Sequence, residues 1–119
     1  MVKVEYSEGL EVIGKDSFYA CQTLQKQQFP STLVEIGSDA FQECRQLESV
    51  GDLPLSLNLI ADSAFICCAA LQSVEIPNPA CRLGIFAFAG CSSLTHARLP
   101  EGLKAIPEGL FSCCISLMD

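Results

Sequence analysis

The chain has 119 residues, half of them hydrophobic, and carries 14 acidic against 7 basic residues for a net charge of −7. That charge repels a phosphate backbone, and no basic run with interleaved aromatic residues reverses it locally, so nucleic acid is not expected as a partner. Every apolar run is far shorter than the roughly 18 residues that suggest a membrane span. The N-terminus alternates charged and apolar residues where a signal peptide would have a continuous apolar core. We therefore expect no membrane insertion and find no export signal in the sequence given.

The sequence repeats a short motif, A-F-x-x-C-x-x-L, which is clearest from Ala40 to Leu47. Self-similarity at a period of about 20 to 50 residues indicates one supersecondary unit stacked on copies of itself. The motif phenylalanines follow one another at intervals of 23, 24, 23 and 23 residues: Phe18, Phe41, Phe65, Phe88 and Phe111. We predict a single domain, residues 1–119, of about five repeat units, here called coils: 1–23, 24–46, 47–70, 71–93 and 94–116.

Each coil begins with a pattern that predicts a short strand. In the fourth coil Val74 and Ile76 alternate with Ser73 and Glu75, and Pro77 follows. Alternation with period two indicates a strand with one buried face. Proline has no N–H for a sheet ladder, so the strand is expected to stop there.

The third coil is one residue longer than the others because Gly51 interrupts its strand pattern. An extra residue inside a strand, marked by glycine, is typical of a bulge. We predict a local break in strand pairing at Gly51.

The second half of each coil has apolar residues spaced by three and four, as in Leu33, Ile36 and Ala40. This spacing predicts a short helical turn. Aspartates such as Asp16 and Asp39 precede it, where an N-cap acceptor is expected. Stacking such units buries what one unit leaves exposed, which predicts an α/β solenoid with parallel strand pairing.

The pattern L-x-x-I-x-I-P-x-x-L-x-x-I-G-x-x-A-F-x-x-C is fullest in Leu71–Pro77 and Ile36–Cys44. It resembles the BspA-type, or Treponema-type, leucine-rich repeat. The resemblance implies a right-handed leucine-rich-repeat solenoid with a parallel β-sheet on its concave side and short helical turns on its convex side. It also implies cell-surface or secreted adhesion proteins, often with the repeats as one module of a longer chain.

The end of the sequence fits that expectation, because Leu117-Met118-Asp119 begins a sixth coil. Solenoids need terminal caps with a polar outer face. We therefore expect the chain to be a segment of a longer array, and expect its uncapped ends to self-associate.

Eight cysteines allow two interpretations: a disulfide or metal framework, or small buried hydrophobic residues. Cysteines stacked at one repeat position have parallel Cβ vectors, which do not suit a disulfide. There is also no C-x-x-C pair, so a zinc site is not indicated. We favour buried, reduced thiols, and predict that Cys81, alone at its repeat position, is the most exposed. The cysteines at the common position, here called the ladder cysteines, are Cys21, Cys44, Cys68, Cys91 and Cys114.

His96 is the only histidine, so a Cys–His nucleophile has to be considered. Its strand position should point it outward, on the opposite side of the coil from the ladder cysteines. No Gly-rich phosphate loop and no hydrolase or zinc-protease motif occurs. We expect no catalysis, no cofactor and no metal.

The outward row of the strands is the remaining candidate site. It holds three basic against four acidic residues, which leaves −6 of the net −7 to the rest of the chain. A nearly neutral, mixed surface on an extended solenoid face favours a protein ligand. Two alternatives stay open: a solvated sheet face without a ligand, and a structural spacer within a larger repeat protein. The predicted partner-binding residues are Lys26, Gln28, Ser73, Glu75, His96 and Arg98.

Overall fold

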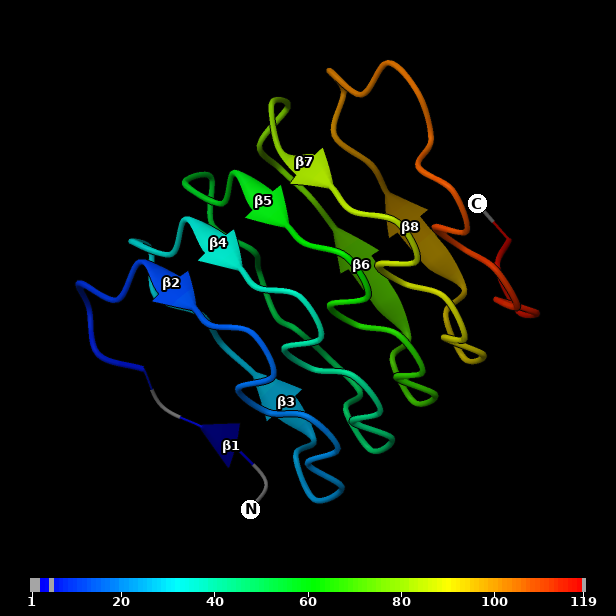
Figure 1. The fold of residues 1–119 in the computed structure, drawn as a ribbon, viewed down its shortest axis with the longest axis horizontal. Coiled ribbons are helices and arrows are strands. Elements are labelled where there is room, and N and C mark those ends of the chain that lie inside the picture. Colours follow the sequence, from blue (N-terminus) through cyan, green and yellow to red (C-terminus); the bar gives the residue numbers. More distant parts are fainter. Residues whose placement is uncertain (1–2, 5, 119) are drawn as a thin grey trace.

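The computed structural model describes residues 3–4, for which only the backbone is considered, and residues 6–118. Within these residues the chain forms short strands and turns and no helix, so nothing described here could cross a membrane as a helix. Figure 1 shows the coils side by side, with the two termini at opposite ends of the stack. The strands that begin coils are β1 (Lys3–Val4), β3 (Lys26–Gln27), β6 (Ser73–Glu75) and β8 (His96–Arg98). Those of the second half are β2 (Val12–Ile13), β4 (Glu35–Ile36), β5 (Leu59–Ile60) and β7 (Arg82–Leu83).

The first strands pair in parallel, one coil apart, as the alternating pattern predicts. β1 pairs with β3, and β6 pairs with β8. The third coil contributes only a single bridge, between Lys26 and Ser49, and does not pair with β6. The predicted break at Gly51 is therefore confirmed.

Gly51 causes the break through its backbone conformation. Its φ of 63° lies in the left-handed region, which a strand does not use. A Cβ at this position would also lie 2.9 Å from the carbonyl oxygen of Gln27. The site thus requires glycine, and the inserted residue is accommodated by a turn in the strand segment of the third coil.

A second parallel sheet, which the sequence analysis did not predict, occupies the region expected to be helical. It runs β2-β4-β5-β7, with Ile13, Ile36, Ile60 and Leu83 in register. The prediction of short helical turns is wrong. The spacing of three and four reflects one inward side chain per bend of the chain. Hydrogen bonds within a coil, such as that from Gln42 to Asp39, alternate with bonds to the next coil, such as that from Phe41 to Ala64, whereas a helix would require consecutive bonds along the chain.

The turns after this sheet explain why no helix forms. Two positions of each turn are left-handed, so a right-handed helix cannot pass through them. Asp16 and Asp39, expected as helix N-caps, occupy the first of these positions with φ of 58° and 57°. Aspartate tolerates this region better than most residues. The non-glycine residues at the two positions are Asp16, Asp39, Ser63 and Phe86, and Ala20, Glu43, Cys67 and Cys113.

The core is a set of identical side chains stacked from coil to coil. Phe41, Phe65 and Phe88 are fully buried. Their ring centroids lie 5.2 and 5.4 Å apart and the rings are almost parallel, at 2° and 1°. At the two ends of the row Phe18 and Phe111 are only partly buried. The central coils therefore hold the best-packed part of the molecule.

We expect Phe65→Ala to lower the free energy of unfolding by about 3–5 kcal/mol, because it removes a fully buried ring and leaves a cavity between two others. Glu75→Ala, at an exposed strand position, should change it by less than about 0.5 kcal/mol. Urea denaturation of both variants measures the difference. Similar costs for the two would contradict a structure held together by its stacked core.

Candidate protein-binding face

The exposed side of β3, β6, β8 and residues 48–53, here called the first-strand face, holds all six predicted partner-binding residues. Each of the six is exposed. Ser73 lies directly opposite His96, and Glu75 lies directly opposite Arg98. The structure thus brings these four together on β6 and β8. Lys26 on β3 and Gln28 just after it lie on the far side of the third coil.

The inward residues between them hold this face in place. Val74 of β6 is 3% exposed and belongs to the core cluster. Gln27, which interrupts the apolar inward row, is also buried, but both ends of its amide are hydrogen-bonded. Its Nε2 donates to the carbonyl oxygen of Lys26 at 2.9 Å, and its Oε1 accepts from the hydroxyl of Tyr6. Burial raises the pKa of the Tyr6 hydroxyl well above its ordinary value, so Tyr6 is a neutral donor.

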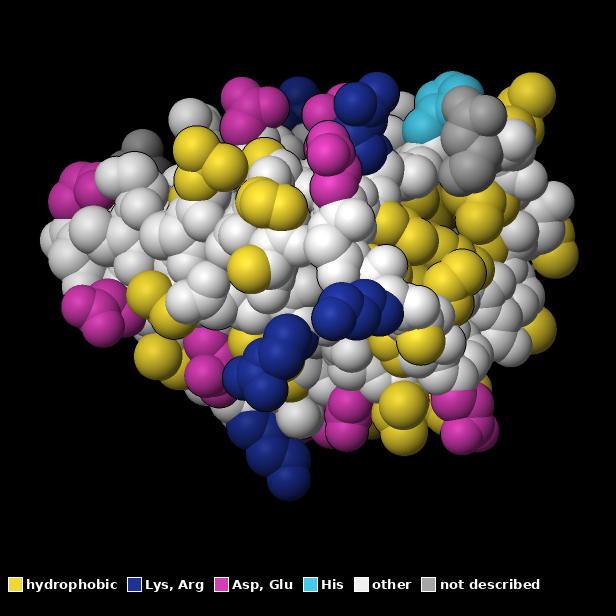
Figure 2. All heavy atoms as spheres, turned by 90° about the horizontal axis from the view of Figure 1, so that it is seen from above, with side chains coloured by type: hydrophobic (Ala, Val, Ile, Leu, Met, Phe, Trp, Pro, Cys, Tyr) yellow, Lys and Arg dark blue, Asp and Glu magenta, His cyan; other side chains and the backbone are white. Residues whose placement is uncertain are grey.

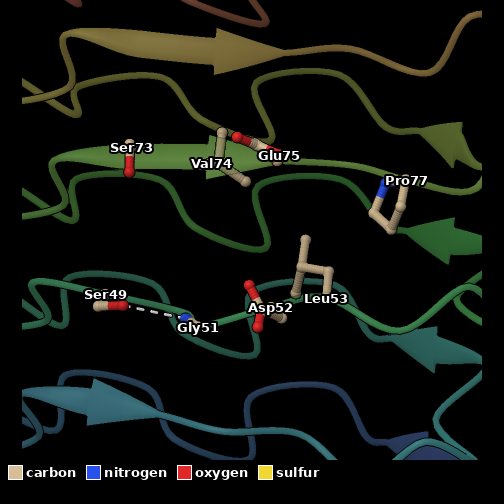
Figure 3. Close-up of a pocket in the computed structure, with 8 residues that line it drawn as sticks. All are labelled: Ser49, Gly51, Asp52, Leu53, Ser73, Val74, Glu75 and Pro77. Atoms are coloured by element: carbon tan, nitrogen blue, oxygen red, sulfur yellow. Dashed lines mark hydrogen bonds between the residues drawn. The ribbon is translucent and has the colours of Figure 1, made fainter.

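A hollow of about 400 Å³ opens on this face between the third and fourth coils. In Figure 3 Leu53 extends from the third coil toward β6, the strand that carries Val74. Both side chains are almost completely buried and form an apolar floor. The residues that line the hollow are Ser49, Gly51, Asp52, Leu53, Ser73, Val74, Glu75 and Pro77.

A second hollow, of about 290 Å³, lies between the third coil and β3 and includes Lys26 and Gln28. Ser49, Gly51 and Asp52 line both hollows. The third coil therefore connects the two halves of the predicted binding row. Ser49 and Asp52 were not among the predicted site residues, although the inserted glycine beside them was the available signal.

The C-terminal end of the solenoid exposes part of its core. A hollow of about 760 Å³ extends from β6 and β8 to Leu99, Ile106, Phe111 and Leu117, and Ile106 is 67% exposed. Figure 2 shows hydrophobic side chains gathered at the end that carries the histidine, whereas acidic side chains are spread along both edges. Exposed apolar surface of this extent promotes association between protein molecules. Self-association of this chain stays a prediction.

Four of the five ladder cysteines, Cys44, Cys68, Cys91 and Cys114, are hydrogen-bond donors as well as core residues. The thiol of Cys68 donates to the carbonyl oxygen of Phe41 in the preceding coil at 3.1 Å, and that of Cys91 donates to Phe65 at 3.3 Å. Cys44 and Cys114 make the same contact with Phe18 and Phe88. A thiol satisfies a buried carbonyl that an alanine would leave without this donor. All eight cysteines are free.

Burial keeps the central ladder thiols protonated. It raises the pKa of Cys44 to about 11 and that of Cys91 to about 12. The pKa of Cys68, which is almost completely desolvated, also lies well above its ordinary value. A protonated thiol is a poor nucleophile, so Cys44, Cys68 and Cys91 are unreactive at neutral pH.

The prediction that Cys81 is the most exposed thiol is wrong. Cys81 is 3% exposed, and burial raises its pKa to about 11. Its N–H bonds to the carbonyl oxygen of Asn78, as that of Leu57 bonds to Pro54, so Cys81 takes the core place of a leucine. The repeat numbering did not reveal this equivalence between Cys81 and Leu57, because the turn after the first strand comes one residue later in the fourth coil. Cys113, at a left-handed turn position, is the exposed cysteine.

His96 is exposed on β8, whereas the ladder cysteines are buried or partly buried. Across residues 3–4 and 6–118, no group of three or more His, Cys, Asp or Glu side chains could hold a metal ion. The exposed charged and polar groups of the first-strand face can offer hydrogen bonds and ion pairs to a partner.

Parallel strands repeating once per coil define the chain as a repeat solenoid. The sequence model of the BspA type leucine rich repeat region matches residues 1–119, and the chain belongs to that family. The resemblance inferred from the repeat pattern is thereby confirmed. A search of curated proteins finds no match.

Several solved structures share the fold. A leucine rich cell surface protein from Faecalibacterium prausnitzii is 30% identical, with a TM-score of 0.89 over 97% of this chain and 30% of its own. A leucine-rich repeat protein from Bacteroides ovatus is 27% identical, with a TM-score of 0.68 over 98% of this chain and 38% of its own. The pneumococcal vaccine antigen PcpA, at 23% identity, shares the fold with a TM-score of 0.85 over 97% of this chain and 28% of its own. The chain thus spans about a third of the length of these proteins.

We expect Cys113 to react first with a thiol reagent under native conditions, because it is exposed. Cys91 should react last or not at all, since a pKa of about 12 in place of 9.0 lowers its thiolate fraction at pH 8 roughly a thousandfold. Mass spectrometry after timed labelling identifies the modified residues. Labelling of Cys68 or Cys91 as fast as Cys113 would contradict the buried ladder.

Proposed function

We propose that the chain is a non-catalytic protein-binding module that uses its first-strand face, as adhesion modules of cell-surface proteins do. The observation that carries the proposal is the register of β6 and β8, which places Ser73 opposite His96 and Glu75 opposite Arg98 on one exposed surface. The family resemblance makes this face the concave one, and solenoids bind through extended concave surfaces.

The chemistry of the face suits a protein partner. It combines charges of both signs with hydroxyl and amide groups. The two open hollows lined by Asp52 give the face depressions into which partner side chains can fit. Charge complementarity of this kind selects partners and speeds their association. No cofactor or metal enters the proposed role, because recognition needs only these side chains and the backbone.

Surface exposure of the parent protein is part of the proposal. The relative from Faecalibacterium prausnitzii is described as a cell surface protein, and PcpA as a vaccine antigen. Both are about three times longer than this chain, so the module would act within a larger protein. The alternative is a structural spacer, in which the coils only extend that protein and the first-strand face has no ligand.

The test is charge reversal at two positions of the face. We expect Arg98→Glu and Lys26→Glu to weaken binding to immobilised extracellular matrix proteins by about tenfold, which corresponds to about 1.4 kcal/mol. Biolayer interferometry with the 119-residue protein measures the affinity.

Arg82→Glu is the matched control for Arg98→Glu, because Arg82 is an exposed arginine on a strand of the other sheet, β7. Lys15→Glu serves the same purpose for Lys26. Equal losses of affinity at the control and test positions would show that the first-strand face is a solvated sheet surface without a ligand. An absence of binding by the unmodified protein would favour the spacer.

A further inference from the structure

We propose that the hollow beside Gly51 is a docking site for an extended segment of a protein partner that carries a lysine or arginine. The segment would bond through its backbone to the open edge of β6, and its cationic side chain would lie near Asp52 and Glu75. This inference rests on the proposed function and specifies which part of the first-strand face makes the central contact.

The edge of β6 that faces the third coil is unpaired. Alternate residues of a strand in a parallel ladder bond to opposite neighbours. The N–H of Ile76 bonds to the carbonyl oxygen of Arg98, and the register of β6 on β8 turns Val74 the same way. The backbone groups of Ser73 and Glu75 therefore face the third coil.

No strand partner meets those groups. No backbone hydrogen bond joins residues 49–53 to β6, and the hydrogen bond that immediately precedes this gap runs from the N–H of Gln72 to the carbonyl oxygen of Glu48 at 3.2 Å. Unpaired strand edges are templates for another chain. Addition of an extended peptide to such an edge is a recurrent mode of recognition.

The gap beside β6 is built into the fold. Ser49 is held to β3, since its carbonyl oxygen accepts the N–H of Gln27 at 3.0 Å. Its hydroxyl oxygen accepts the N–H of Gly51 at 3.0 Å, which fixes the turn away from β6. The third coil is thus tied to its other neighbour, and the hollow exists before any partner arrives. Such pre-organisation lowers the entropic cost of binding.

The hollow is complementary in charge to a cationic side chain. Two carboxylates, Asp52 and Glu75, and two hydroxyls, Ser49 and Ser73, line the hollow, and none of its lining residues is basic. The apolar floor of Leu53 and Val74 suits the methylene stem of lysine or arginine, whose charged head reaches the polar rim. A volume of about 400 Å³ is within the roughly 300–1,000 Å³ typical of ligand sites.

The test uses the 119-residue protein and the capped pentapeptide Ac-Val-Thr-Lys-Thr-Val-NH₂, followed by amide chemical shifts in two-dimensional NMR. We expect the peptide to move the amide resonances of Ser73 and Glu75. Replacing its lysine by glutamate, or replacing Asp52 by asparagine in the protein, should weaken binding at least tenfold. Asp16→Asn, at an exposed turn position away from this face, is the matched control and should leave the affinity unchanged.

Deletion of Gly51 is the decisive variant. It leaves Ser-Val-Asp-Leu-Pro in the third coil, which matches Ser-Val-Glu-Ile-Pro of Ser73–Pro77, so the ladder can close across the gap. We expect the deletion to abolish peptide binding while the fold is kept. Unchanged binding to the deletion variant, no binding to the unmodified protein, or shifts confined to β8 would overturn the proposal. The last outcome would leave the proposed function standing, and the charge-reversal variants test that function separately.

Discussion

Backbone hydrogen bonding from one coil to the next is the constraint on which the rest of this structure depends. The N–H groups of Phe41, Phe65 and Phe88 donate to carbonyl groups one coil further on, at 2.8 to 3.2 Å. Between these residues, others close tight turns within their own coil, as Gln42 does on Asp39. A coil alone would leave half of these groups unpaired, and buried unpaired groups are costly. The coils are therefore stable as a stack, whose members support one another.

The same constraint selects the side chains of the repeat. Because every coil superimposes on the next, equal residues meet in rows, and flat aromatic rings stack where smaller groups would leave gaps. The cysteine row adds a donor to this pattern: Cys68 reaches the carbonyl of Phe41, whose oxygen also accepts the N–H of Cys44 within its own coil. Burial holds these thiols protonated, which keeps them in the donor role.

The sequence was sufficient for the repeat, the first strands and the break, because each has a direct local cause. Alternation around Val74 predicts a buried strand residue, and a glycine inserted after Val50 predicts lost pairing. It was insufficient for the second sheet. Leu33, Ile36 and Ala40 have the spacing of a helix face, and the helix is excluded by left-handed turn residues such as Asp39 and Glu43, which that spacing does not reveal. The prediction that Cys81 is exposed was wrong for a related reason. The fourth coil reaches its turn one residue later than the other coils, and this places Cys81 in the core. The candidate face was predictable as a row, but the hollow at Asp52 depends on how two neighbouring coils separate.

Residue-resolved hydrogen exchange of the backbone amides tests the central claim most directly: backbone hydrogen bonds join each coil to the next, and Gly51 opens the first sheet between the third and fourth coils. The account predicts strong protection at Phe41, Phe65 and Phe88, and at Val74 and Ile76, which face β8. It predicts rapid exchange at Ser73 and Glu75, in the same strand but facing the gap. Equal protection along Ser73–Ile76 would show that the third and fourth coils are joined there and would contradict the account.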